Sequence, residues 1–211
     1  MLTLESAREW YPQTDPVHGY DHIVRVYHTA ENLALSEGAD LEIVRAAALL
    51  HDIEGSYSTS DERHNHHQQS ADIAAEILRA EGWDEERIAA VQHCIRAHRY
   101  RDRREPPATL EAKVLFDADK LDVLGAVGVA RVIGYAVQAG QPVYAPPSPH
   151  FLATGEQEPG EPHSAYHEHL FKLRHIRERL FTAAARAIAE ERHAYLEAYF
   201  QRLIAEFNGE K

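Results

Sequence analysis

The feature that most constrains this chain is the apolar run Ala-Ala-Ala-Leu-Leu at residues 46–50, which ends directly in His51-Asp52. The run is too apolar for a surface helix, so we expect a helix over about residues 41–52 that crosses the middle of the protein. A carboxylate at the end of such a helix is costly unless it is paired, hydrogen-bonded or bound to a cation. The run therefore predicts a core helix with polar chemistry at its end.

The remaining apolar positions repeat at helical spacing, and no stretch of four to eight residues alternates in the manner of a strand. We therefore predict an all-α, single-domain helical bundle. The pattern of residues 108–139 is helical with a break near Gly125, and Gly38 and Asp40 are typical of a helix stop and a helix N-cap. Further helices are predicted over about residues 4–11, 18–37, 65–80, 84–100, 164–190 and 191–207.

Length and proline placement bear on domain number. With 211 residues and 44% apolar content, the chain is long enough for one substantial core. Residues 140–162 are rich in proline and predict one long loop. The residues after this loop are too few for a second core of ordinary stability, so a single domain over 1–211 is expected.

Charge and cysteine content exclude several classes of function. The net charge of −12 disfavours binding to a nucleic acid polymer or to an anionic membrane. Cys94 is the only cysteine, which excludes a disulfide framework and a zinc module of the CxxC type, so a metal ion would be held by nitrogen and oxygen. No secretory signal or membrane-spanning run is recognised, and a cytoplasmic location is expected.

Three further acids lie in an apolar setting, at Asp117, Asp119 and Asp122 in VLFDADKLDVLG. At ~100° per residue, Asp119 and Asp122 lie within ~60° of each other on a helix, whereas Asp117 points ~160° away from Asp119. His22 lies beside the apolar stripe of the helix predicted over residues 18–37. These side chains, with His51 and Asp52, are candidates for one metal site.

Four segments of the chain resemble a bacterial subfamily of small hydrolases in the HD superfamily of metal-dependent phosphohydrolases. These segments are HGYDHIVRVYHTA, RAAALLHDIEG, KVLFDADKLDVLGAVGVAR and ERHAYLEAYFQRLIAEF. The resemblance covers nearly the whole chain. It implies an HD core over about residues 18–131, with C-terminal helices over 164–207. It also implies four metal ligands, namely His22, His51, Asp52 and Asp119.

Two imidazoles and two carboxylates suit Mn²⁺, Fe²⁺, Co²⁺, Ni²⁺ or Zn²⁺ and also admit Mg²⁺. Such a cation lowers the pKa of a bound water and neutralises charge on a phosphoryl group. The resemblance implies hydrolysis of a small phosphorylated substrate, in particular a nucleoside triphosphate or nucleotide pyrophosphohydrolase reaction. Asp52 then belongs to the catalytic set as well as to the ligand set.

Other side chains are candidates for contacts with the substrate or for proton transfer. Glu54 is a candidate general acid or base, although the better-known nucleotidases and alarmone hydrolases place their acid at the position of Gly55. His66 and His98 either contact phosphate or complete a second metal site. The remaining candidates for phosphate or substrate contacts are His18, Arg25 and Lys120. Alternatively, His18 is a turn residue, Arg25 forms a salt bridge and Lys120 is a surface lysine.

Two other functions remain open at this point. Some HD-fold proteins use two iron ions for oxygenation, and His66 with His98 would complete such a site. A ligand sensor without catalytic turnover is the other alternative. The sequence gives no prediction of oligomeric state.

Overall fold

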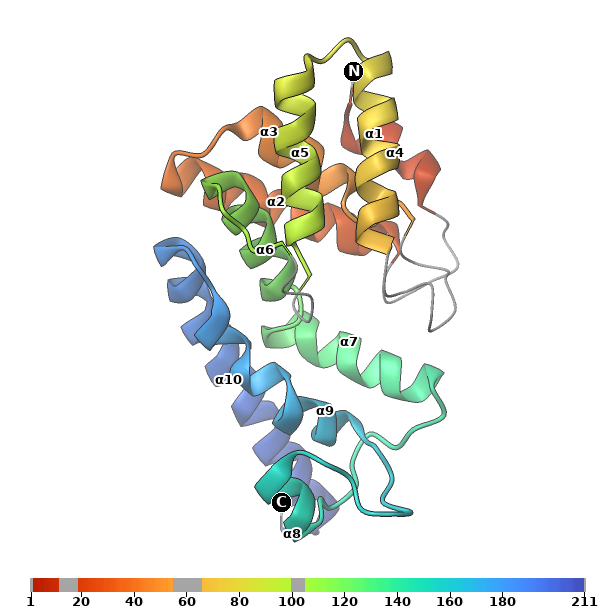
Figure 1. Cartoon of the computed structure of the whole chain (residues 1–211). Helices are drawn as coiled ribbons and strands as arrows, with labels where there is room; N and C mark the ends of the chain where they lie inside the picture. Colours follow the sequence, from red (N-terminus) through yellow and green to blue (C-terminus); the bar gives the residue numbers. More distant parts are fainter. Residues whose placement is uncertain (1, 12–18, 55–65, 100–104, 211) are drawn as a thin grey trace. The chain divides into compact units, whose positions relative to one another are not determined.

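The computed structural model describes residues 2–11, 19–54, 66–99 and 105–210, and every regular element within these ranges is a helix (Figure 1). The prediction of an all-α fold is confirmed. Within the same ranges no single helix is long and apolar enough to cross a membrane, and only a bent pair of consecutive helices reaches the necessary length and apolarity together.

The chain divides into two compact units, which are described separately below. The first comprises Met1–Lys120 with Leu180–Ala185, and the second comprises Leu121–Arg179 with Arg186–Lys211. The expected domain boundaries stay predictions, namely a single domain over 1–211, an HD core over 18–131 and C-terminal helices over 164–207.

The first unit contains the predicted core helix and the helices that pack on it. The helix α3 (Leu41–Leu50) packs against α2 (Tyr20–Glu37) and α5 (Glu85–Ala97), and α4 (His66–Ala80) packs against α5. Residues Ala46, Ala47, Ala48, Leu49 and Leu50 of α3 are all at most 2% exposed, as the apolar run predicts. The helical elements of this unit are α1 (Leu4–Ala7), the 3-10 helix η1 (Arg8–Trp10), α2 (Tyr20–Glu37), α3 (Leu41–Leu50), α4 (His66–Ala80), α5 (Glu85–Ala97) and α6 (Leu110–Leu121).

The ends of α2 and α3 follow from local sequence signals. Gly38 adopts φ +77° and its N–H donates to the Ala34 carbonyl, which ends α2 in the left-handed conformation that glycine favours. The Asp40 side chain accepts from the backbone N–H groups of Glu42 and Ile43 and caps α3. Both predicted signals are confirmed.

The second unit is also helical. Its elements are α7 (Gly125–Gln138), α8 (Pro149–Thr154), α9 (Ala165–Phe171), the 3-10 helix η3 (Leu173–Arg179) and α10 (Ala183–Phe207), of which residues from Arg186 onward belong to this unit. The predicted break near Gly125 is present, because α6 ends at Leu121 and α7 starts at Gly125 with φ +68°.

Two segments differ from the sequence prediction. The predicted boundary between residues 190 and 191 is wrong, because α10 runs unbroken through it. The chain breaks instead before α10, where the Asp117 carboxylate accepts hydrogen bonds from the backbone N–H groups of Phe181 and Thr182. The predicted loop over 140–162 contains α8, because Ser148 caps this short helix and Pro149 suits its first position.

Candidate metal centre

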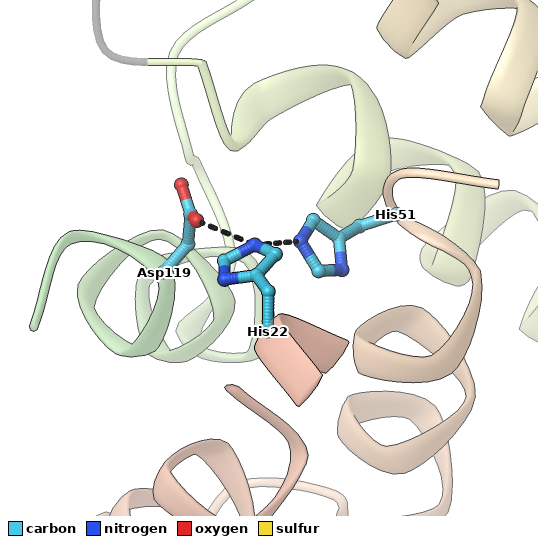
Figure 2. Close-up of side chains that lie close together, drawn as sticks. All are labelled: His22, His51 and Asp119. Carbon is cyan, nitrogen blue, oxygen red and sulfur yellow. Dashed lines mark hydrogen bonds and ion pairs between the residues drawn. The ribbon is translucent and has the colours of Figure 1, made fainter. Parts of the chain in front are cut away.

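Two histidines from different helices of the first unit face each other. His22 lies in the first turn of α2, and His51 follows the last residue of α3. Both are buried, with 2% and 0% of their surface exposed, and their Nε2 atoms are 3.4 Å apart (Figure 2). The folded chain therefore brings together two imidazole nitrogens that are far apart in sequence.

Two carboxylates extend this pair. Asp119, near the end of α6, places Oδ1 3.4 Å from His22 Nε2 (Figure 2). Asp52 places Oδ2 3.8 Å from Nε2 of both His22 and His51. All four side chains predicted as metal ligands thus lie in one cluster.

A second group uses the other oxygen of Asp52. Oδ1 of this carboxylate lies 3.5 Å from Nε2 of His66, at the start of α4, and 3.5 Å from Nε2 of His98, just after α5. One donor atom from each of these three side chains lies within 4.8 Å of the other two, and the same holds for His22, His51 and Asp119. The site therefore consists of two adjacent groups of possible metal ligands.

The backbone fixes which nitrogen two of the histidines present. His51 Nδ1 lies 2.9 Å from the Ala48 carbonyl oxygen, and His98 Nδ1 lies 2.5 Å from the Ile95 carbonyl oxygen. A carbonyl only accepts, so Nδ1 carries the proton in both rings. In its neutral form each ring then presents the lone pair of Nε2 to the cluster, which is the form that binds a metal ion.

The electrostatics of Asp52 favour an anionic carboxylate. Burial alone would raise the pKa of Asp52, but positive charge on His51, together with the facing His66 and His98, outweighs burial and holds this pKa well below its usual value. Oδ1 is buried and makes no hydrogen bond of good geometry within the described residues. A buried carboxylate oxygen that lacks such a bond fits a position beside a cation.

The distances also fit a divalent cation. Bonds of about 2.1 Å from a metal ion to nitrogen and oxygen place neighbouring ligand atoms about 3.0–3.5 Å apart. The Nε2–Nε2 and Nε2–Oδ1 distances around His22 are both 3.4 Å. The residues present therefore fit a bound metal ion with small movements of the side chains.

Of the other predicted site residues, Lys120 lies at the edge of the cluster. Lys120 donates to Asp119 Oδ2 and lies over the Phe116 ring, 5.4 Å from its centroid. Burial would raise the pKa of Asp119, and Lys120 and His22 outweigh it, so this pKa is lowered. Arg25 lies one turn after His22 on α2 and is half-buried.

Two predicted residues are less well defined. Glu54 is exposed, and its backbone N–H donates to Ser70 Oγ at 3.3 Å, while its assignment as a catalyst stays a prediction. His18 lies outside the described residues, so its assignment as a substrate contact is also untested.

The structure distinguishes the three acids of the segment 117–122. Asp117 is fully buried and accepts from Phe181 and Thr182, away from the histidines, as the predicted helical angle implies. Asp122 pairs with Arg131 within the second unit. Asp119 is therefore the acid of this segment whose contact with the histidines the structure describes.

Sequence patterns did not indicate Tyr11, which contacts the turn that carries the His-Asp pair. Its hydroxyl donates to the Leu49 carbonyl oxygen at 2.7 Å. Tyr11 precedes Pro12 in a short N-terminal segment without a recognisable motif, so no sequence signal links it to residues about forty positions later.

These residues match a known family. The family model of the HD domain matches residues 19–124, which contain His22, the His51-Asp52 pair and Asp119. The chain therefore belongs to the HD domain family.

Its relatives include small bacterial proteins of similar length. The chain is 31% identical to the uncharacterized protein YpgQ of Bacillus subtilis, over 97% of this chain and 94% of that protein. The crystal structure of YpgQ in complex with ADP has a TM-score of 0.76 and 30% identity, and covers 99% of this chain and 100% of that one. An HD-superfamily hydrolase from Bacillus thuringiensis has a TM-score of 0.70 and 26% identity, over 97% and 96% of the two chains.

Proposed function

We propose that this protein is a metal-dependent phosphohydrolase that cleaves a small phosphorylated substrate, in particular a nucleoside triphosphate or a related nucleotide. The observation that carries the proposal is the presence of two adjacent groups of possible metal ligands, one of His22, His51 and Asp119 and the other of Asp52, His66 and His98. Asp52 Oδ2 lies 3.8 Å from Nε2 of both His22 and His51, which joins the two groups. Two kinds of relative support it, namely YpgQ, which was crystallised with ADP, and the similar structure that is described as an HD-superfamily hydrolase.

In this proposal His22, His51, Asp52 and Asp119 hold one divalent cation. When bound, such a cation supplies an acidified water and neutralises charge on the phosphoryl group. The chain contributes the fixed Nδ1–H tautomer of His51, which keeps its Nε2 lone pair directed into the site. The mixed nitrogen and oxygen donor set is compatible with Mn²⁺, Fe²⁺, Co²⁺, Ni²⁺, Zn²⁺ and Mg²⁺.

Cationic side chains at the edge of the cluster would bind the substrate. Lys120 already neutralises one oxygen of Asp119, and its ammonium group has further donors for a phosphate oxygen. Arg25, one turn along α2 from His22, is assigned to a second phosphate contact. The acidic net charge of the chain does not oppose this, because part of it is site carboxylate that a cation offsets.

A second candidate function follows from the group of Asp52, His66 and His98. The neutral His98 ring presents a lone pair to Asp52, and a lone pair binds a cation more readily than an anionic phosphate oxygen. A second cation at this group is the arrangement that a di-iron oxygenase requires. Iron content near two per chain together with oxygen consumption would favour this candidate over phosphohydrolysis.

The decisive experiment compares the wild type with Asp52→Ala after removal of metal and reloading with each of the cations named above. Both proteins are incubated with a panel of nucleotides and simple phosphoesters, and phosphate and pyrophosphate are measured separately. We expect the wild type alone to release one of the two products. Folded, metal-loaded wild type that releases neither from any substrate contradicts the proposal.

A further inference from the structure

We propose that Tyr11 is a positioning residue that fixes the orientation of His51 and Asp52 toward the metal site. This inference rests on the metal site of the proposed function. Tyr11 lies outside the segment that matches the HD domain, which starts at residue 19. It acts on the site through the backbone and is not itself a ligand.

The argument starts from the turn that carries the His-Asp pair. A continued α-helix would direct the N–H of Asp52 to the Ala48 carbonyl and the N–H of Ile53 to the Leu49 carbonyl. In this structure α3 ends at Leu50, and Ile53 N–H donates to the Leu50 carbonyl at 3.3 Å. The α-helical hydrogen-bond pattern therefore ends where the two ligands are attached.

Tyr11 supplies a hydrogen bond at the point of this departure. Its hydroxyl donates to the Leu49 carbonyl oxygen at 2.7 Å. The Ala48 carbonyl is used by His51 Nδ1. The Tyr11 hydroxyl thus binds the carbonyl that the N–H of Ile53 would bind in a continued helix.

The surroundings of Tyr11 make this hydrogen bond a fixed feature. The side chain is 2% exposed, so few water molecules reach its hydroxyl to compete for the Leu49 carbonyl.

The consequence for the site is geometric. Successive side chains of a regular helix point about 100° apart, which would separate His51 from Asp52. Here both reach the same atom, since His22 Nε2 lies 3.4 Å from His51 Nε2 and 3.8 Å from Asp52 Oδ2. Loss of the Tyr11 hydroxyl frees the turn and should loosen this convergence.

The test uses Tyr11→Phe, which keeps the ring and removes the hydroxyl, in the full-length protein. The matched control is Tyr20→Phe, because the Tyr20 hydroxyl donates to a backbone carbonyl in the same way, to Leu4 at 2.6 Å, and this carbonyl lies outside the His-Asp turn. Binding of Mn²⁺ is measured without substrate by electron paramagnetic resonance of the free ion, and hydrolysis of nucleotides is measured separately with Mn²⁺ saturating.

We expect Tyr11→Phe to weaken Mn²⁺ binding about 10-fold or more, as removal of a group that supports metal ligands typically does, and Tyr20→Phe to bind like the wild type. Equal Mn²⁺ affinity in Tyr11→Phe and wild type overturns the inference, even if the wild type hydrolyses nucleotides. Weaker binding in Tyr11→Phe supports it even if no hydrolysis occurs, in which case only the proposed function falls.

A second variant covers the case in which Tyr11→Phe gives no cooperative thermal melt. Then 3-fluorotyrosine is placed at position 11 alone, which keeps the ring and the hydrogen bond but makes the hydroxyl a stronger donor. A changed dissociation constant for Mn²⁺ supports the positioning role, and an unchanged one overturns it.

Discussion

The Nε2 atoms of His22 and His51 lie 3.4 Å apart, although the two residues belong to different helices. Because His51 carries its proton on Nδ1, its Nε2 lone pair faces the His22 ring. A positive charge between two buried nitrogens at this separation stabilises them. The carboxylates of Asp119 and Asp52 also place negative charge near the same atom, His22 Nε2. The electrostatics of the cluster, as well as its residue types, therefore suit a cation.

The first prediction concerns the effect of metal on stability. A ligand that binds only the folded state at 100 times its dissociation constant stabilises that state by about 2.7 kcal/mol. For a chain of this size, each kcal/mol raises the melting temperature by about 2–4 °C. We expect metal-depleted protein to melt several degrees higher after Mn²⁺ or Ni²⁺ is added, as measured by differential scanning calorimetry.

The control for this prediction is His22→Ala, which removes the nitrogen at the centre of the cluster. Its melting temperature should no longer respond to the metal. A response equal to that of the wild type would show that the stabilising ion binds elsewhere.

The second prediction separates the ligand role of Asp52 from the predicted proton-transfer role of Glu54. Asp52→Asn should lose metal binding and hydrolysis together, because the amide presents a neutral oxygen where the cation needs an anion. Glu54→Gln should keep wild-type metal affinity and lower kcat by about 100-fold, the lower range for loss of a general acid or base. Metal titration and steady-state kinetics measure the two effects.

The outcome that removes Glu54 from the mechanism is simple to recognise. A Glu54→Gln variant with wild-type kcat at every pH would show that this exposed carboxylate takes no part in proton transfer.

The third prediction contrasts Asp117 with Asp119. Asp117 accepts from two backbone N–H groups and from Thr182 Oγ1, so Asp117→Ala leaves buried donors without an acceptor. We expect a loss of about 3 kcal/mol in the free energy of unfolding, by urea titration of metal-free protein. Asp119→Ala should cost less stability and abolish metal binding, and the reverse pattern would contradict the assignment of the two acids.

The fourth prediction concerns pH and His169 in the second unit. Burial lowers the pKa of His169 to about 4, and its Nε2 lies 3.2 Å from Glu197 Oε1. An unfolded histidine has a pKa of about 6.5, so between about pH 4 and 6.5 the unfolded state binds more protons and stability falls as the pH falls. Urea unfolding at several pH values should show this loss.

The matched variants for this prediction are His169→Phe and His175→Phe, the second of which replaces an exposed histidine of the same unit. Only His169→Phe should flatten the pH dependence, by up to about 1.4 kcal/mol per pH unit for one proton. An unchanged slope in His169→Phe would assign the pH dependence to other groups.

The sequence predicted most of the helices because burial and helical spacing are encoded locally. The core helix ends where the apolar run of residues 46–50 ends, and the break near Gly125 follows from a glycine that adopts a positive φ. The start of α10 was not predictable in the same way. It depends on Asp117, which caps the chain at Phe181 and Thr182 from a distant helix.

The site shows the same limit. Four metal ligands were predicted from their apolar setting and from a family resemblance, and the structure brings their side chains together. They are His22, His51, Asp52 and Asp119. The position of His66 and His98 at one oxygen of Asp52 depends on how α4 and α5 pack, which the sequence spacing does not encode. Tyr11 reaches its partner only in the folded chain.

The position of Asp52 between the two groups has a thermodynamic consequence. Oδ2 faces His22 and His51 while Oδ1 faces His66 and His98, so a single negative charge serves both sides. Occupancy of one side then alters the affinity of the other, and linkage requires the same factor in both directions. The centre would titrate as one coupled unit, and its stoichiometry would depend on the concentration of free ion.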